Sequence, residues 1–324
     1  MIYISEPQQT NLTKQFQKQA GAYLALPTIK VSDIATMMRL LQRHVKFEKH
    51  SSINDPYVIT DIGGDDGSWM LDPFFKLDIS LKINVIEPNK NSLKVYKENL
   101  ANQPKVIPGM FLNTILEKSP LQIIPPANLI LCSHSLYYSK NSWEDETIPL
   151  EQHLFSKLLK GLQEKGVLCV ILQSEDKALV QNQYGIHAEL ENITYPIMFR
   201  LEGKEGLSHA DHVSYTHSGI FSKSMQAYAI RLKREKGIDI NIFSAPAISQ
   251  VSLGNINSKE NSKGKYIQED YQASQLLSFY TKGYYDQYTP DEQRRLLDFI
   301  KNNCMTPEGR YVMTHVNTVF TITL

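Results

Sequence analysis

The sequence predicts an α/β fold built on a doubly wound, mostly parallel sheet. Short apolar or β-branched runs alternate with amphipathic helical segments between residues 56 and 172, an order typical of parallel sheets. A turn with three glycines follows the first of these runs, as in strand–turn–helix units that bind ligands. Residues 311–322 alternate and are β-branched, which predicts a final strand.

Composition describes an ordinary globular protein of 324 residues, with 42% hydrophobic and 21% charged residues. Lys plus Arg and Asp plus Glu both total 34, which argues against a nucleic-acid binder with a basic face. The chain has neither a membrane-length apolar run nor a secretory pattern at its start. Three widely spaced cysteines, Cys132, Cys169 and Cys304, indicate buried thiols rather than disulfides. We therefore expect a cytoplasmic protein without membrane or nucleic-acid partners.

Residues 1–50 precede the glycine turn and are predicted to form an N-terminal helical cap. Within 31–41, apolar residues recur at Ile34, Met37, Met38 and Leu41, which is helical spacing. This segment either caps a substrate pocket or covers one edge of the sheet. The remaining residues, 51–324, are predicted to form the main domain.

The turn after the first strand reads Gly63-Gly-Asp-Asp-Gly67. Glycines there let a ligand lie against backbone amides at a helix N-terminus. A dinucleotide fingerprint would have glycine at 63, 65 and 68, but Asp65 and Ser68 stand in two of these positions. Two acids would also repel a pyrophosphate. The turn therefore favours a cationic cofactor without phosphate, S-adenosylmethionine, although an ordinary tight turn is the simpler alternative.

The second strand is predicted within the run 84–88 and ends at Glu87, which is 26 residues after Asp61. A carboxylate in this position accepts hydrogen bonds from a ribose diol. The alternative is an acid that merely favours the N-terminus of the next helix, which carries Leu93, Tyr96 and Leu100 on one face. Further along the chain we predict strands at 105–109, 128–133, 167–172 and within 238–253, and helices at 151–165, at 218–236 and after the capping box 289–292.

The strand at 128–133 runs directly into His134-Ser-Leu-Tyr-Tyr138. Ligands of open α/β sheets bind outside the carboxyl ends of strands, so this cluster is well placed for a site. The stretch 180–216 is rich in His and Tyr and is predicted to be either an inserted lid or a surface excursion. Histidines 209, 212 and 217 lack cysteine or helix-spaced acidic partners, so no metal site is predicted.

Several pieces of the sequence carry a family resemblance: Ile62-Gly-Gly, Val85-Ile-Glu-Pro, Tyr96-Lys-Glu-Asn-Leu100, Leu136-Tyr-Tyr138 and Val316-Asn-Thr318. With them the chain resembles class I S-adenosylmethionine-dependent methyltransferases, and most closely the histamine N-methyltransferase family. The resemblance implies a seven-stranded Rossmann-like sheet. It also implies that Gly63, Glu87, Ser92, Asn113 and Ser133 surround the cofactor, and that His134, Tyr137, Tyr138 and Asn317 face the substrate.

Three departures from the family pattern concern the site. Asp65 replaces a glycine of the turn, and His134 replaces a glutamine near the substrate. The acidic residue that grips the substrate's cation has no clear equivalent in 24–30, where only Lys30 is charged. These departures leave the identity of the methyl acceptor open.

The function predicted from the sequence is methyl transfer from S-adenosylmethionine to a small molecule, at an amine nitrogen, by a monomer or weak dimer. His134 either takes a proton from the acceptor or only caps the strand end, and Tyr137 and Tyr138 either form an aromatic wall or pack in the core. The alternatives are a protein methyltransferase of the same fold and a non-catalytic cofactor-binding descendant. The predicted site comprises catalytic His134, Tyr137 and Tyr138; cofactor-binding Asp61, Gly63, Gly64, Gly67, Glu87, Ser92, Asn113, Ser133 and His134; and substrate-binding Tyr138, Trp143, Tyr195 and Asn317.

Overall fold

The fold is described from a computed structural model. The described residues are 27–50, 52–67, 70–116, 120, 123–136, 145, 147–174, 187–201, 203, 218–254, 258–260, 266–268, 277, 281, 284–304 and 311–324.

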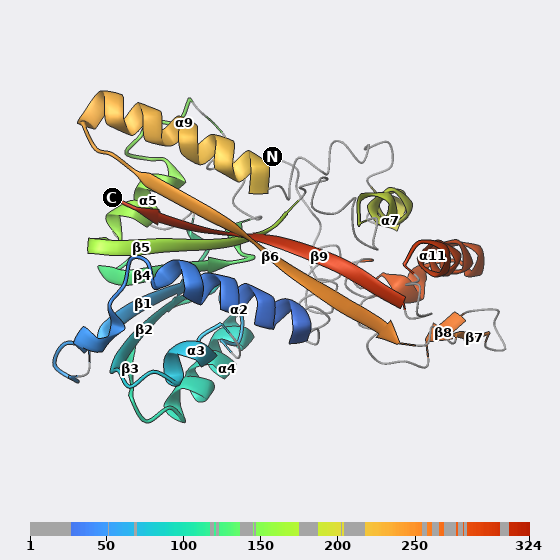
Figure 1. Ribbon diagram of the computed structural model, residues 1–324, viewed down its shortest axis with the longest axis horizontal. Coiled ribbons are helices and arrows are strands. Elements are labelled where there is room, and N and C mark those ends of the chain that lie inside the picture. Colours follow the sequence, from blue (N-terminus) through green and yellow to red (C-terminus); the bar gives the residue numbers. More distant parts are fainter. Residues whose placement is uncertain are drawn as a thin grey trace. The chain divides into compact units, whose positions relative to one another are not determined.

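A seven-stranded sheet with strand order β3-β2-β1-β4-β5-β9-β6 forms the centre of the fold (Figure 1). The first five strands of this order pair in parallel, and β9 runs antiparallel to β5. This arrangement confirms the predicted doubly wound, mostly parallel sheet and the predicted final strand, which is antiparallel. The strands are β1 Tyr57–Ile62, β2 Leu81–Ile86, β3 Val106–Leu112, β4 Ala127–Ser133, β5 Leu162–Gln173, β6 Asn241–Gly254 and β9 Tyr311–Thr323.

Helices cover both faces of the sheet, as Figure 1 shows, because the strands are apolar on both sides. Alternate residues of β4 enter two different cores: Leu129 and Leu131 one, Ile130 and Cys132 the other. The first core also takes side chains from α2 Pro27–Leu41, α3 Asp72–Phe75 and α4 Lys90–Ala101, and the second from α5 Leu154–Lys160 and α9 Ser218–Lys236. The three cysteines are buried free thiols, as predicted.

The predicted helix at 151–165 was wrong in its length. The observed α5 ends at Lys160, Gly161 caps it, and β5 begins at Leu162. Gly161 packs so tightly that an added Cβ would lie 2.5 Å from a methyl group of Ile124. Its carbonyl also accepts the N–H of Ala127 at 2.9 Å. Tertiary packing therefore turns the chain before Leu162, although the leucine spacing continues the helical pattern.

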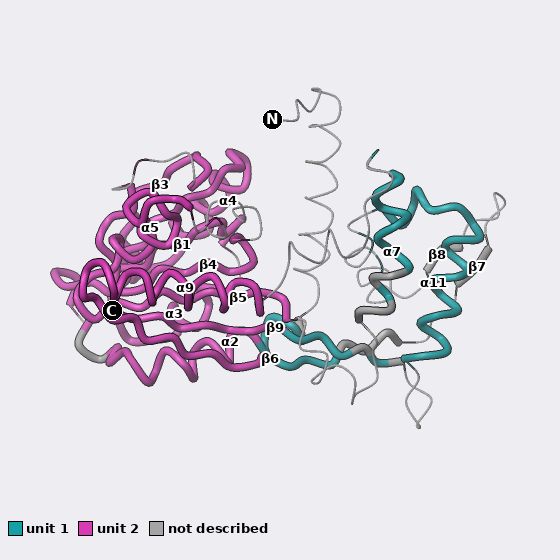
Figure 2. Tube along the Cα trace, turned by 90° about the horizontal axis from the view of Figure 1, so that it is seen from above, with its two compact units in different colours: residues 1–32, 175–214, 248–316 teal, residues 33–174, 215–247, 317–324 magenta. Residues whose placement is uncertain are grey.

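Contacts between Cα atoms divide the chain into two compact units (Figure 2). One comprises residues 33–174, 215–247 and 317–324, and holds both cores described above. The other comprises 1–32, 175–214 and 248–316. The predicted boundary at residue 50 and the lid role of 180–216 stay predictions.

The second unit contains α7 His187–Leu201 and α11 Pro290–Asn303. Arg200 of α7 donates to both carboxylate oxygens of Glu292 on α11, at 2.8 and 3.0 Å. The capping box predicted at 289–292 is confirmed, with the Thr289 and Glu292 side chains each bonded to the other's backbone. The unit also contains η4 Tyr285–Gln287 and the strand pair β7 Ser258–Glu260 and β8 Tyr266–Gln268.

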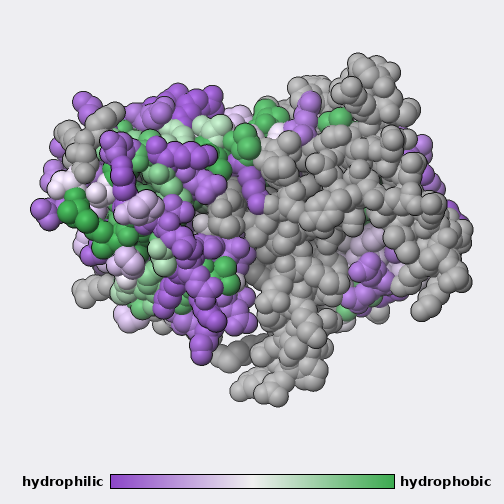
Figure 3. Space-filling model, turned by 90° about the horizontal axis from the view of Figure 1, so that it is seen from below, coloured by the Kyte–Doolittle hydropathy of each residue, from purple (hydrophilic) through white to green (hydrophobic). Residues whose placement is uncertain are grey.

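The described part of the surface in Figure 3 mixes hydrophilic residues with small hydrophobic areas. Exposed apolar side chains such as Ile53 and Ile230 come from distant parts of the sequence, which is normal for globular proteins. Among the described helices, none is both long enough and apolar enough to cross a bilayer.

Candidate functional site

The site is built at the carboxyl ends of β2, β1 and β4, which are neighbours in the sheet. The strand order reverses between β1 and β4, and such a switch point is where open α/β sheets bind ligands. Backbone hydrogen bonds hold the loops that leave these ends. Gly63 donates its N–H to Ile86 at 2.8 Å, and Glu87 donates its N–H to Leu112 at 3.0 Å. The glycine turn and Glu87 therefore lie side by side.

Two glycines of the turn adopt the left-handed conformation that glycine tolerates best, Gly63 at φ +68° and Gly67 at φ +67°. Each also lies against a neighbouring element. A Cβ on Gly63 would collide with Ser135 beyond β4, and one on Gly67 would lie 2.6 Å from the Tyr96 ring of α4. The turn is therefore packed between the end of β4 and the face of α4.

Asp61, the penultimate residue of β1, is buried under the turn and accepts a hydrogen bond from the Tyr96 hydroxyl at 2.7 Å. Burial raises the pKa of Asp61 to about 6, and the Tyr96 hydrogen bond opposes this rise. Its second carboxylate oxygen, Oδ1, is buried without a side-chain or backbone hydrogen bond among the described residues. A buried, unsatisfied acceptor at a turn of this kind is suited to a donor from a ligand.

Replacing Tyr96 with phenylalanine is expected to lower the free energy of unfolding by about 1–3 kcal/mol at pH 8, because ionised Asp61 loses a hydrogen-bond donor. The loss should be smaller at pH 5, where Asp61, with its pKa of about 6, is protonated. Denaturant unfolding at both pH values measures it. Tyr57→Phe is the matched control, since the buried Tyr57 hydroxyl has no hydrogen-bond partner among the described residues. Equal losses for Tyr96→Phe at the two pH values would contradict the pairing.

Glu87 follows β2 and is 6% exposed. One carboxylate oxygen accepts the N–H of Asn89 at 2.7 Å, and the other accepts the N–H of Asp65 in the turn at 3.2 Å. Burial raises the pKa of Glu87 to about 7; the two hydrogen bonds lower it, and the charges of Asp65 and Asp61 raise it further. Glu87 thus links the carboxyl ends of β1 and β2. Each of its carboxylate oxygens has a further lone pair, so Glu87 can also accept hydrogen bonds from a ligand.

Asp65 stands in the turn with a positive φ of +52°. Its carboxylate accepts a hydrogen bond from the hydroxyl of Ser92 on α4, and burial raises its pKa. Ser92 was predicted to bind the cofactor, and the structure places it beside the turn with its hydroxyl on Asp65. Asn99 of the same helix donates to the carbonyl of Asp66 at 2.9 Å.

Asn113 follows β3, which extends to Leu112 and so is longer than the predicted 105–109. Its amide nitrogen donates to the carbonyls of Glu87 and Pro88, at 3.0 and 2.8 Å. Asn113 therefore holds the loop that carries Glu87.

Ser133, the last residue of β4, and the two residues that follow it, His134 and Ser135, lie at the same carboxyl end of the sheet. The hydroxyl oxygens of Ser133 and Ser135 are buried and have no hydrogen-bond partner among the described residues. His134 has a positive φ of +54°, and its backbone N–H donates to the backbone carbonyl of Ile171 at 2.9 Å. The Ser135 side chain lies against Gly63 of the turn, and the two unsatisfied hydroxyls add donors to the acceptors on Asp61 and Glu87.

The structure adds Asp33, which the sequence reasoning missed. Asp33 lies on α2 and is fully buried. Asn317 of β9 donates to its two carboxylate oxygens at 2.9 and 2.8 Å, and Nε2 of His134 lies 3.5 Å from Oδ2. A signal was present in the sequence, because Asp33 falls at i+4 spacing between the buried Ile29 and Met37. One acid on an apolar helix stripe needs buried partners.

Several of the residues that the sequence singled out lie outside the part of the chain that the structure describes, and one belongs to the second unit. Tyr137, Tyr138 and Trp143 lie outside the described residues, as do His209, His212 and His217. Tyr195 belongs to the second unit, where it is 5% exposed and its ring stacks on Phe199 with centroids 6.2 Å apart. Within the described ranges, no three His, Cys, Asp or Glu side chains are grouped so as to hold a metal ion.

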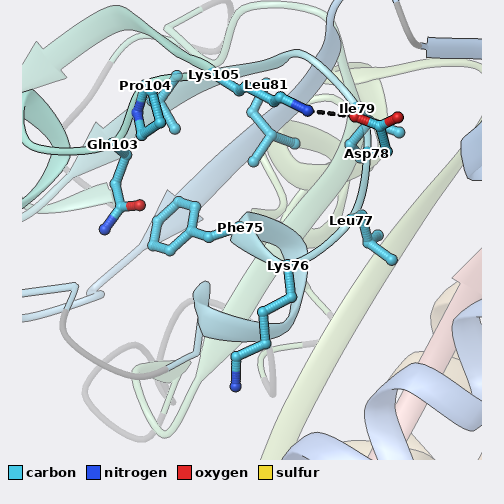
Figure 4. A pocket seen from close by; sticks show the side chains of 10 residues that line it. Phe75, Lys76, Leu77, Asp78, Ile79, Leu81, Gln103, Pro104 and Lys105 are labelled. Carbon is cyan, nitrogen blue, oxygen red and sulfur yellow. Dashed lines mark hydrogen bonds and ion pairs between the residues drawn. The ribbon is translucent and has the colours of Figure 1, made fainter.

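A small pocket of about 210 Å³ lies at the amino ends of the parallel strands, beside the first residues of β2 and β3 (Figure 4). Phe75, Gln103 and the paired Lys105 and Asp78 are among its lining residues. The hydrogen bond from Lys105 lowers the pKa of Asp78. Because parallel α/β sheets carry their sites at the carboxyl ends of strands, we do not assign this pocket a role in the candidate site.

Comparison with known proteins found similarity only among solved structures; no family model and no curated protein matches the chain. The YcgJ protein from Bacillus subtilis shares 8% identity, with a TM-score of 0.47 over 89% of this chain and 97% of that one. A SAM-dependent methyltransferase from Leishmania major shares 13%, with a TM-score of 0.44 over 73% and 76%. The plantazolicin methyltransferase BpumL, solved with SAH, shares 12%, with a TM-score of 0.42 over 97% and 91%. The strand order, and not these similarities, defines the fold.

Proposed function

We propose that this protein is an S-adenosylmethionine-dependent methyltransferase that methylates an amine nitrogen of a small molecule. The observation that carries the proposal is the pairing of Glu87 with the glycine turn at the switch point of the sheet, joined by the hydrogen bond from Asp65. A buried acid at the end of the second strand is suited to the two hydroxyls of a ribose.

The charges around the turn support a cationic ligand. Asp61, Asp65 and Glu87 each have a raised pKa, chiefly because each is buried. A ligand that brought phosphate to these three acids would add repulsion in a partly dry site. A sulfonium with an ammonium group would instead stabilise their ionised forms.

The unsatisfied polar atoms fit the same group. Asp61 offers a buried acceptor, and Ser133 and Ser135 offer buried hydroxyls, at the ends of the two strands that flank the switch point. S-adenosylmethionine, when bound, supplies a methyl carbon on a positively charged sulfur that accepts the bonding pair as it leaves. Glu87 and the turn would hold this group, and their contribution is to fix the methyl carbon in line with the acceptor, worth up to ~7–11 kcal/mol in such reactions.

The proposed acceptor is a small-molecule amine, because the side chains next to the turn on the end of β4 are suited to one. His134 lies beside the buried Asp33, and a carboxylate with an imidazole can bind an amine and take its proton. The resemblance to histamine N-methyltransferases supports this choice.

Isothermal titration calorimetry with S-adenosylmethionine tests the proposal first. We expect a dissociation constant of about 1–100 μM, within the usual range of cofactor and substrate constants, and no heat with NAD⁺ or ATP at the same concentrations. Incubation with a metabolite extract and cofactor labelled in its methyl group then identifies the acceptor. Binding of NAD⁺ or ATP instead of S-adenosylmethionine would refute the proposal. Tight binding of S-adenosylmethionine without any labelled product would point to a non-catalytic descendant.

A further inference from the structure

The imidazole of His134 contacts a carboxylate that is held from its other side. Asp33 is 1% exposed in its side chain and His134 is 19% exposed. The Asn317 amide nitrogen lies within 2.9 Å of both oxygens of Asp33, and Nε2 of His134 lies 3.5 Å from one of them. The three residues come from α2, from the loop directly after β4 and from β9, so the fold, and not local sequence, brings them together.

The contact with Asp33 favours one of the two neutral forms of the His134 ring. An ionised carboxylate only accepts, and an amide nitrogen only donates. Asn317 therefore favours Asp33 as a carboxylate, and a carboxylate favours a proton on the His134 nitrogen that faces it. In a neutral imidazole with a proton on Nε2, the lone pair is on Nδ1.

Building on the proposed function, we infer that Asp33 is a positioning residue that keeps the proton of His134 on Nε2, so that Nδ1 receives the proton released by the amine. The amine nitrogen forms a bond to the methyl carbon, while the carbon–sulfur bond breaks and leaves its electron pair on sulfur. The nitrogen then holds one proton more than the neutral product, and this proton passes to Nδ1. The imidazolium so formed is stabilised by the Asp33 carboxylate.

The 3.5 Å separation is long for a hydrogen bond, and contacts of this type often shorten when substrates bind. The backbone of His134 is fixed by its bond to Ile171 and by its left-handed conformation.

Nitrogen NMR of the ring tests the inference without any substrate. The protein has nine histidines, and the resonances of His134 are assigned by their loss in His134→Gln. At a pH where the ring is neutral, we expect Nε2 to carry the proton in the wild-type protein. In Asp33→Asn, the new carbonyl accepts from Asn317 and the new amide donates toward His134. The proton should therefore move to Nδ1.

Kinetics then test the consequence. Asp33→Asn is expected to lower kcat about 100-fold, within the usual range for a general base, while calorimetry gives a dissociation constant for S-adenosylmethionine within about twofold of wild type. The matched control is Asp78→Asn, which changes an exposed acid at the amino ends of the parallel strands and should alter neither value. If Asp33 acts through His134, the double variant Asp33→Asn with His134→Gln will be no slower than His134→Gln alone.

A wild-type ring with its proton on Nδ1, or an even mixture of both forms, would overturn the inference. A normal kcat in Asp33→Asn, or additive losses in the double variant, would also overturn it. Should Asp33→Asn not fold, the wild-type tautomer and the kcat of His134→Gln still decide. Failure of the proposed function is distinguishable, because it appears as the absence of cofactor binding in the wild-type protein, whatever the tautomer of His134.

Discussion

Replacing Glu87 with glutamine is expected to raise the dissociation constant for S-adenosylmethionine about 100-fold. Hydrogen bonds to a charged acceptor contribute roughly 1.5–3 kcal/mol, and two ribose hydroxyls would lose that acceptor. Calorimetry at pH 8 measures the change. Glu98→Gln is the control, because Glu98 is an exposed acid on α4 whose ion-pair partner among the described residues is a surface lysine, Lys94. The affinity of this variant for S-adenosylmethionine should equal that of the wild-type protein.

The same substitution should stabilise the ligand-free protein at pH 8. Folding raises the pKa of Glu87 from 4.5 to about 7, so the folded state binds more protons than the unfolded state between these values. Wild-type stability therefore falls as the pH rises through this window, by about 3 kcal/mol in total. Glutamine does not titrate and keeps part of the hydrogen bonding, which leaves a net gain of about 1–2 kcal/mol at pH 8.

Thermal unfolding of both proteins from pH 5 to pH 8 checks this sign. The melting temperature of Glu87→Gln relative to wild type should rise with pH and become higher by several degrees at pH 8. A difference in melting temperature that stays constant across this pH range would show that ionisation of the buried Glu87 does not destabilise the folded protein. A normal affinity for the cofactor in the same variant would remove Glu87 from the binding site.

Gly67→Ala is expected to destabilise the protein by about 3 kcal/mol or more. The left-handed backbone alone costs roughly 1–2 kcal/mol for a residue with a Cβ. The new methyl group would also lie 2.6–2.7 Å from three atoms of the buried Tyr96 ring, which overpacks the space between the turn and α4. Denaturant unfolding measures the loss.

Gly237→Ala separates the two contributions. Gly237 has φ +70°, close to the +67° of Gly67, but an added Cβ there would meet nothing within 4 Å. It should therefore show the backbone cost alone, about 1–2 kcal/mol. Equal losses in the two variants would mean that the contact between the turn and Tyr96 contributes nothing.

The features that the sequence predicted well are local ones. The alternation of strands and helices predicted the sheet, and Glu87 does follow the second strand, because its distance from the turn is set by one strand–helix–strand unit. Its role in cofactor binding stays a prediction. Asp33 was missed because its partners are His134 and Asn317, 101 and 284 residues away. No local pattern shows that a β9 residue will lie next to the first described helix.

The end of α5 shows the other limit. The leucine periodicity at 154, 158 and 162 is a valid helical signal, but the chain turns at Gly161, where contact with Ile124 leaves no room for a side chain. Only the packed core determines that boundary. The roles of Tyr137, Tyr138, Trp143 and Tyr195 stay predictions.

Side chains on one face of α4 form hydrogen bonds to the glycine turn and to the strand before it. Ser92, Tyr96 and Asn99 follow one another at helical spacing, and bind Asp65, Asp61 and Asp66 respectively. The turn is therefore anchored to α4 at Asp65 and Asp66, and the strand that leads into it is anchored at Asp61. The ordering of flexible segments usually subtracts from affinity, so here little entropy remains to be lost on binding. Loosening these hydrogen bonds would therefore weaken ligand affinity even where every contacting atom is kept.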